Sequence, residues 1–133
     1  MRDRLDMTVR THSQAATLVS KNARSSAEIA DAVAQARERS AHRWMKAGIA
    51  VTTNASVPTT LLRRDFAADS AGMALLQAHL AQGDITQRAV DKVLKLAWTL
   101  CDLSGVAQPG LEEIAQAIEI RGEMAQPQQE LAV

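Results

Sequence analysis

Arg88 is the residue whose type and position most suggest chemistry in this sequence. It falls in the first turn of a predicted helix that Asp84 or Thr86 can cap and that ends at Ser104 and Gly105. A cation there faces the positive end of the helix dipole, which costs roughly 0.3–1 kcal/mol unless an anion lies close by. Because helices tolerate arginine at any position, the spacing alone favours a solvated side chain.

Other reactive residue types do not form a recognisable catalytic or metal-binding pattern. His12, His42 and His79 are far apart, so a metal site built from them is not expected. Cys101 precedes Asp102, but no histidine lies next to them in the sequence to act as the base that would activate the thiol. The sequence also lacks a Gly-x-x-x-x-Gly-Lys-Ser/Thr phosphate loop and an apolar strand ending in paired acidic residues. We therefore expect no enzymatic activity from the isolated chain.

The elements that would position these residues are predicted to be helices. The chain is rich in alanine and only 2% aromatic, a composition that favours closely packed helices over sheets. Ser25 and Glu28 have the spacing of a capping box, and Pro109 suits the first position of the last helix. The fold class predicted is all-α, a small helical bundle. Its core should include four residues of the Arg88 helix, namely Val93, Leu94, Ala97 and Cys101.

The two ends of the chain differ from this helical region. Leu5, Met7 and Val9 alternate with polar residues, which predicts a short strand, yet no second strand is evident to pair with it. We therefore interpret residues 1–12 as a remnant strand of a larger core and expect this segment to be mobile. The remaining divisions are a linker at 13–24, the helical domain at 25–122 and a disordered tail at 123–133.

Charge and hydropathy narrow the function classes. The 133 residues include fifteen acidic and fifteen basic side chains, so the net charge of zero argues against strong non-specific binding to nucleic acid. A basic face is confined to one helix and is diluted by Glu38; its members are Arg37, Arg39, Arg43 and Lys46. A single cysteine excludes an internal disulfide. No signal peptide and no apolar run of about 20 residues is present, which predicts a cytoplasmic location and no membrane partner.

Several segments, taken in order, resemble the C-terminal lid domain of the magnesium-chelatase-type AAA+ ATPases, and among these the ComM/YifB-like branch. The resemblance is carried by Thr86-Gln87-Arg88-Ala89, by the run from Val93 to Leu103, and by Ile114-Ala115-Gln116-Ala117-Ile118-Glu119-Ile120-Arg121. Near the start, residues 2–9 are similar to the segment that closes the family's ATPase core, and residues 25–39 resemble its linking helix. Trp98 stands where the family has arginine, and Ile120 where it has tyrosine. A tryptophan at position 98 is expected to cover the core or an interhelical seam.

This resemblance implies specific roles for two arginines. Arg88 occupies the sensor-2 position, from which the lid contacts the nucleotide γ-phosphate and couples hydrolysis to lid rotation. Arg4 matches an arginine finger that acts in trans on the nucleotide of the adjacent subunit. The implied cofactors are ATP and Mg²⁺ in a longer parent protein, with none bound by the isolated chain.

The resemblance also implies partners for the domain. They are an upstream ATPase core of the same polypeptide and the neighbouring subunits of a ring, with DNA as a further partner of the parent. The alternative is a stand-alone helical module for protein interaction, and an upstream reading frame that encodes a phosphate loop would separate the two hypotheses.

Overall fold

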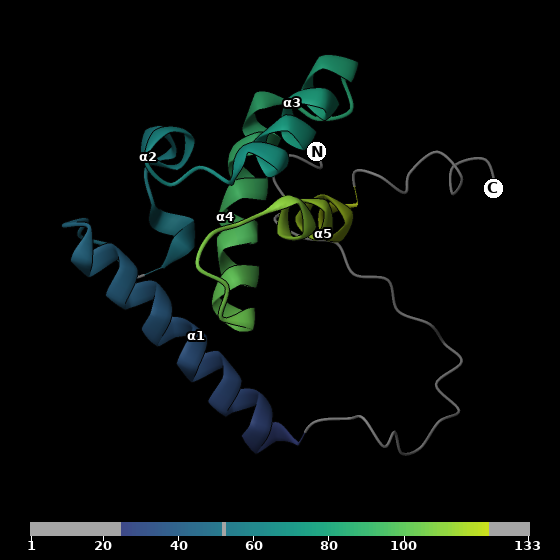
Figure 1. The fold of residues 1–133 in the computed structure, drawn as a ribbon. Helices are drawn as coiled ribbons and strands as arrows, with labels where there is room; N and C mark the ends of the chain where they lie inside the picture. Colours follow the sequence, from purple (N-terminus) through teal and green to yellow (C-terminus); the bar gives the residue numbers. More distant parts are fainter. Residues whose placement is uncertain (1–24, 52, 123–133) are drawn as a thin grey trace, which may run out of the picture.

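The computed structural model describes residues 25–51 and 53–122 (Figure 1). Within these ranges all regular elements are helical and no strand occurs, so the prediction of an all-α fold is confirmed. The interpretations of residues 1–12, 13–24 and 123–133, and with them the position of Arg4, lie outside the described residues. In chain order the helices are α1 (Ser26–Lys46), the 3₁₀ turn η2 (Asn54–Ser56), α2 (Thr59–Arg64), α3 (Ser70–Gln82), α4 (Gln87–Ser104) and α5 (Leu111–Arg121).

Side chains at the helix starts fix where three of the helices begin. The Ser25 hydroxyl accepts from the Glu28 backbone N–H at 3.1 Å, and the Asp69 carboxylate accepts from the N–H of Gly72 at 2.8 Å. At α4, the Thr86 hydroxyl accepts from the N–H of Ala89 at 3.1 Å. Each bond satisfies a backbone donor that the helix itself leaves unpaired. Thr86, rather than Asp84, is therefore the cap that places Arg88 in the first turn of α4.

The start of α5 differs from the prediction that Pro109 would be its first residue. Gly110 is the N-cap and α5 begins at Leu111, because the carbonyl of Pro109 accepts from the Asp69 N–H at 2.8 Å. That bond uses the Pro109 carbonyl outside the helix and ties the start of α5 to the start of α3. The Glu113 carboxylate then accepts from the Gly110 N–H at 2.8 Å.

Helix α4 runs through the middle of the bundle, with α1 on one side and α5 on the other (Figure 1). The four core residues predicted on α4 are each 0% exposed, namely Val93, Leu94, Ala97 and Cys101. Trp44, Phe66 and Trp98 meet edge to face between α1 and α4, with the ring centroids of Trp44 and Phe66 4.8 Å apart. Burial of this apolar surface is the main source of stability for the bundle.

Ile29, Val33, Ala36, Ser40 and Trp44 recur at helical spacing, which predicts one buried face along all of α1, but the first turns of the helix do not belong to the core. Ala36, Ser40 and Trp44 are buried as expected, whereas Ile29 is 48% exposed and Val33 is half-buried. The N-terminal end of α1 runs past the end of α4, so the contacts between these two helices do not extend along the whole of α1 (Figure 1). The 3.6-residue period of the apolar residues was correct, but the period alone does not reveal how far the neighbouring helix extends.

Candidate functional site

Arg88 lies in the first turn of α4 and its side chain is exposed. The first turn holds no acidic residue, and within residues 25–51 and 53–122 no hydrogen bond or ion pair to the Arg88 side chain is formed. The guanidinium therefore meets the positive end of the helix dipole without a compensating anion. The side chain is therefore open to solvent and accessible to an anion that approaches this end of α4.

The two carboxylates closest to Arg88 along the chain are both held by other side chains. Asp91, three residues later, accepts from Arg63 Nε of α2 at 2.7 Å, and Arg63 Nη2 also donates to the Gln87 carbonyl at 3.0 Å. Asp84, four residues earlier, lies 3.1 Å from His79 Nδ1 of α3. Neither carboxylate is directed to Arg88.

A small pocket of about 210 Å³ borders the same turn of α4. It brings side-chain amides and the Arg63 guanidinium to the rim of an otherwise apolar hollow between α2, α3 and α4. A polar group bound in this pocket would therefore meet both hydrogen-bond donors and acceptors, although Arg88 itself does not line it. The residues that line this pocket are Arg63, Met73, Leu76, Gln77, Leu80, Gln87 and Val90.

A second polar group lies near the other end of α4, and we call it the Asn54–Asp102 cluster after its two buried members. Asn54, in η2, accepts through Oδ1 from Ser40 Oγ at 2.9 Å and from Trp44 Nε1 at 2.9 Å. Its Nδ2 donates to Asp102 Oδ2 at 2.9 Å and to Thr99 Oγ1 at 3.1 Å. Asn54 thus connects α1 and α4 through hydrogen bonds that are shielded from water, where an unpaired polar group would be costly.

Arg43 completes this cluster. Its two terminal nitrogens each donate to one oxygen of Asp102 at 2.7 Å, which is the bidentate geometry that makes arginine–carboxylate pairs strong. The guanidinium carbon also lies 4.7 Å from the Trp44 ring centroid and 4.2 Å from that of Trp98. Arg39 donates to the Asp102 backbone carbonyl. Asp102 therefore binds two of the four cations that the sequence placed on a basic face, Arg43 through its carboxylate and Arg39 through its backbone carbonyl, whereas Arg37 and Lys46 remain exposed.

Trp98 lies at the interhelical seam, as predicted from the substitution of the family's arginine. It is 4% exposed, and its indole Nε1 donates to the Phe66 backbone carbonyl at 2.8 Å. The Arg43 guanidinium lies over the face of the Trp98 ring, so a cation–π interaction is present at this position although tryptophan is not itself charged.

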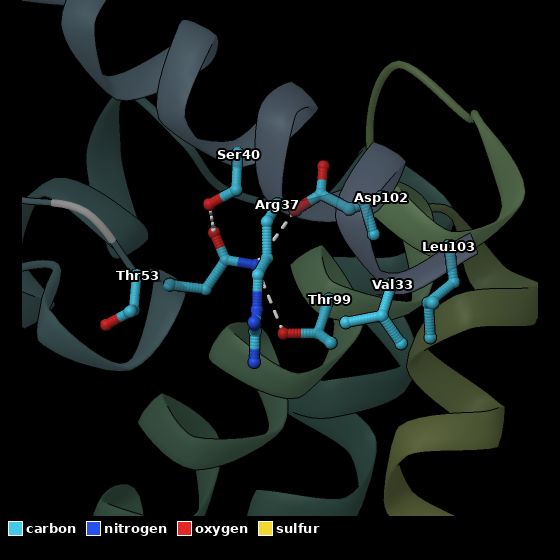
Figure 2. Close-up of a pocket in the computed structure, with 9 residues that line it drawn as sticks. Val33, Arg37, Ser40, Thr53, Thr99, Asp102 and Leu103 are labelled. Carbon is cyan, nitrogen blue, oxygen red and sulfur yellow. Dashed lines mark hydrogen bonds between the residues drawn. The ribbon is translucent and has the colours of Figure 1, made fainter. Parts of the chain in front are cut away.

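A pocket of about 300 Å³ borders the Asn54–Asp102 cluster (Figure 2). Ser40, Thr99 and Asp102 converge on its polar side, while Val33 and Leu103 supply an apolar side. The polar side chains of the cluster bond to one another, as the dashed lines show. These hydrogen bonds join α1 to α4, whereas Arg37, which also lines the pocket, forms no hydrogen bond or ion pair within residues 25–51 and 53–122.

A wider pocket of about 530 Å³ lies where α1 and α4 end, and several cations line it. Arg43 and Lys46 belong to the last turn of α1, and Ala47 and Gly105, the C-caps of α1 and α4, also line it. Cations at helix C-termini offset the negative end of the helix dipole. Their presence is accounted for by the two helix ends, so this pocket does not require a bound anion.

Cys101 has no catalytic features. It is 0% exposed, and burial raises its pKa to about 12, with Glu113 and Asp102 adding to the rise. A thiol with so high a pKa stays protonated and is a poor nucleophile at neutral pH. Among the described residues, no group of three or more His, Cys, Asp or Glu side chains is placed to hold a metal ion. None of the described helices is long and apolar enough to cross a membrane.

Two comparisons with known proteins found matches that cover most of this chain. The family model described as "Magnesium chelatase, subunit ChlI C-terminal" matches residues 23–121. The chain is 39% identical over 120 residues to the uncharacterized protein Mb2921c of Mycobacterium bovis and to the uncharacterized protein Rv2897c of Mycobacterium tuberculosis. Each match covers 90% of this chain and 24% of the relative, so the chain spans about a quarter of the length of these relatives. No solved structure matches the chain.

Proposed function

Because the chain belongs to the magnesium chelatase ChlI C-terminal family, we propose that it is the helical lid of a magnesium-chelatase-type AAA+ ATPase. In this proposal the lid closes over a nucleotide bound by an ATPase core elsewhere in the same polypeptide. Arg88 is the sensor-2 residue that contacts the γ-phosphate and couples hydrolysis to movement of the ring.

The observation that supports this role is the exposed Arg88 guanidinium in the first turn of α4, which has no partner within residues 25–51 and 53–122. A planar guanidinium matches the oxygens of a phosphate through two parallel hydrogen bonds. Arg43 and Arg63 are both bound to aspartates, whereas Arg88 has no such partner among the residues described. A phosphate would supply the negative charge that this helix end lacks.

The rest of the proposal concerns the parent protein. ATP and Mg²⁺ would be bound mainly by the ATPase core, with Arg88 adding one charged contact from the lid. Arg4 would contact the nucleotide of a neighbouring subunit and stabilise the charge of the transition state. We place the protein in the ComM-like branch because no feature of the sequence points to porphyrin, and we propose a cytoplasmic ring with DNA as a further partner.

The experiment that tests this proposal is ATP turnover by the complete protein carrying Arg88→Ala. Turnover should fall by roughly tenfold or more, since a charge-assisted hydrogen bond is worth ~1.5–3 kcal/mol. The matched control is Arg64→Ala, because the Arg64 side chain is 76% exposed on α2 and, among the described residues, forms an ion pair only with its neighbour Asp65, at 3.6 Å. Unchanged turnover in an assembled Arg88→Ala protein would rule out the sensor-2 role.

A separate measurement addresses the isolated 133-residue chain. Without a phosphate loop it should neither bind ATP tightly nor hydrolyse it. Micromolar affinity in a calorimetric titration, or turnover above that of buffer, would contradict the assignment of nucleotide binding to a separate core.

A further inference from the structure

We propose that Arg63 is a positioning residue that keeps Arg88 unpaired by occupying the carboxylate of Asp91. This inference rests on the proposed function of Arg88, and it assigns a role to a residue of α2 that does not itself contact nucleotide. In this view the lid carries two arginines beside one aspartate, and the pairing of one arginine leaves the other available.

The helical geometry makes Asp91 the natural competitor for Arg88. Residues three apart on a helix are neighbours on its surface, and opposite charges at this spacing attract each other. Arg88 and Asp91 have this spacing on α4. An Arg88–Asp91 pair would direct the guanidinium back along the helix and neutralise it, in competition with any phosphate.

Arg63 competes with this pairing through one contact to Asp91 and a second to the carbonyl of Gln87. Its Nε donates to Asp91 Oδ1 at 2.7 Å and its Nη2 donates to the Gln87 carbonyl at 3.0 Å. The guanidinium of α2 thus spans the first turn of α4 from Gln87 to Asp91, on either side of Arg88 in the sequence. Asp84, the other nearby carboxylate, is engaged in turn by His79.

The local charge also depends on Arg63. With Arg63 in place, two arginines and one aspartate give this turn a net positive charge, which adds to the positive end of the helix dipole. Without Arg63, Arg88 and Asp91 together would be neutral. The Arg63 side chain is 41% exposed, and a surface pair of this kind contributes little to fold stability. Loss of Arg63 should therefore change the affinity of Arg88 for an anion more than it changes the stability of the fold.

The first test uses the 133-residue chain, labelled with ¹⁵N, and follows the Nε–Hε NMR signal of Arg88. Arg63→Ala should shift this signal because Asp91 becomes free to pair with Arg88. The signal should return to its original position in the double variant Arg63→Ala/Asp91→Ala, and Arg64→Ala should leave it unmoved. An unshifted signal in Arg63→Ala, or the same shift in the double variant, would overturn the inference.

The second test measures kcat/KM for ATP in the complete protein. Arg63→Ala should lower it about twofold, the typical size of a pair of opposite charges at this spacing. Asp91→Ala should not lower it, and the double variant should recover the original value. If Arg63 merely held α2 against α4, both single variants would lower the activity alike and the double variant would not recover.

The outcomes also separate this inference from the function on which it rests. If Arg88→Ala leaves kcat/KM unchanged, the sensor-2 role itself fails. If Arg88→Ala lowers kcat/KM but Arg63→Ala does not, the sensor-2 role stands and the role of Arg63 is rejected.

Discussion

The two ends of α4 use arginine in opposite ways. Near its C-terminal end, Arg43 reaches Asp102 from α1 and is 16% exposed, with both terminal nitrogens bound to the carboxylate and two tryptophan rings beside it. At its N-terminal end, Arg88 is exposed and bound to no residue that the structure describes. The comparison shows that burial and pairing, rather than residue type, distinguish an arginine that stabilises the fold from one that can bind a ligand.

The largest effect is expected where the polar bonds are buried. Asp102→Ala leaves the Arg43 guanidinium and the Asn54 amide without their carboxylate, and removing one partner of a buried pair typically costs about 3–5 kcal/mol. Urea denaturation of the 133-residue chain should show a loss of this size. A change below about 1 kcal/mol would mean that the Asn54–Asp102 cluster is open to water, and the contrast between the two ends of α4 would fail.

Leu94, in the middle of α4, provides a reference value for the stability lost when an apolar core side chain is removed. Leu94 is 0% exposed, so Leu94→Ala should lower the free energy of unfolding by ~2–5 kcal/mol through lost burial and a new cavity. Thermal denaturation followed by circular dichroism measures the effect. An unshifted melting temperature would show that this face of α4 does not pack as described.

A smaller effect is expected from changing the shape of a buried cation without removing its charge. Arg43→Lys keeps one positive charge but cannot donate two parallel hydrogen bonds to Asp102. We expect a loss of about 1–3 kcal/mol, because one of the two Arg43–Asp102 hydrogen bonds is lost. If lysine matched arginine within error in the same urea experiment, the bidentate geometry would not be the source of the stability.

The smallest effect on stability is expected at Arg88. Arg88→Ala should leave the free energy of unfolding unchanged or raise it by roughly 0.3–1 kcal/mol, because it removes a cation from the positive end of the helix dipole. Denaturation at low and high salt would check the electrostatic origin, since the gain should shrink as salt increases. A loss of stability comparable to that of Asp102→Ala would show that Arg88 has a structural role.

Much of the fold could be predicted from local sequence. Ser25, Asp69 and Thr86 cap helices because each precedes a helical apolar pattern at the right spacing. The buried face of α4 followed from the period of Val93, Leu94, Ala97 and Cys101, all of which are fully buried. The Arg88 position was likewise predicted within the first turn of a helix, because capping is a local property.

The sequence alone did not predict the Asn54–Asp102 cluster. The sequence places Arg43 with the other cations of its helix, and nothing in the sequence around Asn54 indicates a buried amide. Asp102 on the apolar side of α4, four residues after Trp98, was the signal that could have indicated a buried partner of opposite charge. The identity of that partner depends on which helix packs there, and Asp102 and Arg43 are 59 residues apart in the chain.

The sequence by itself therefore determined the helices, their caps and the presence of a cation at the start of α4, because these depend on residues within a few positions of one another. Only the tertiary structure decided which cations remain available. Asp102 and Asp91 each select an arginine from a different helix, Arg43 from α1 and Arg63 from α2. Such pairings depend on distances between helices in space, which the order of residues along the chain does not give.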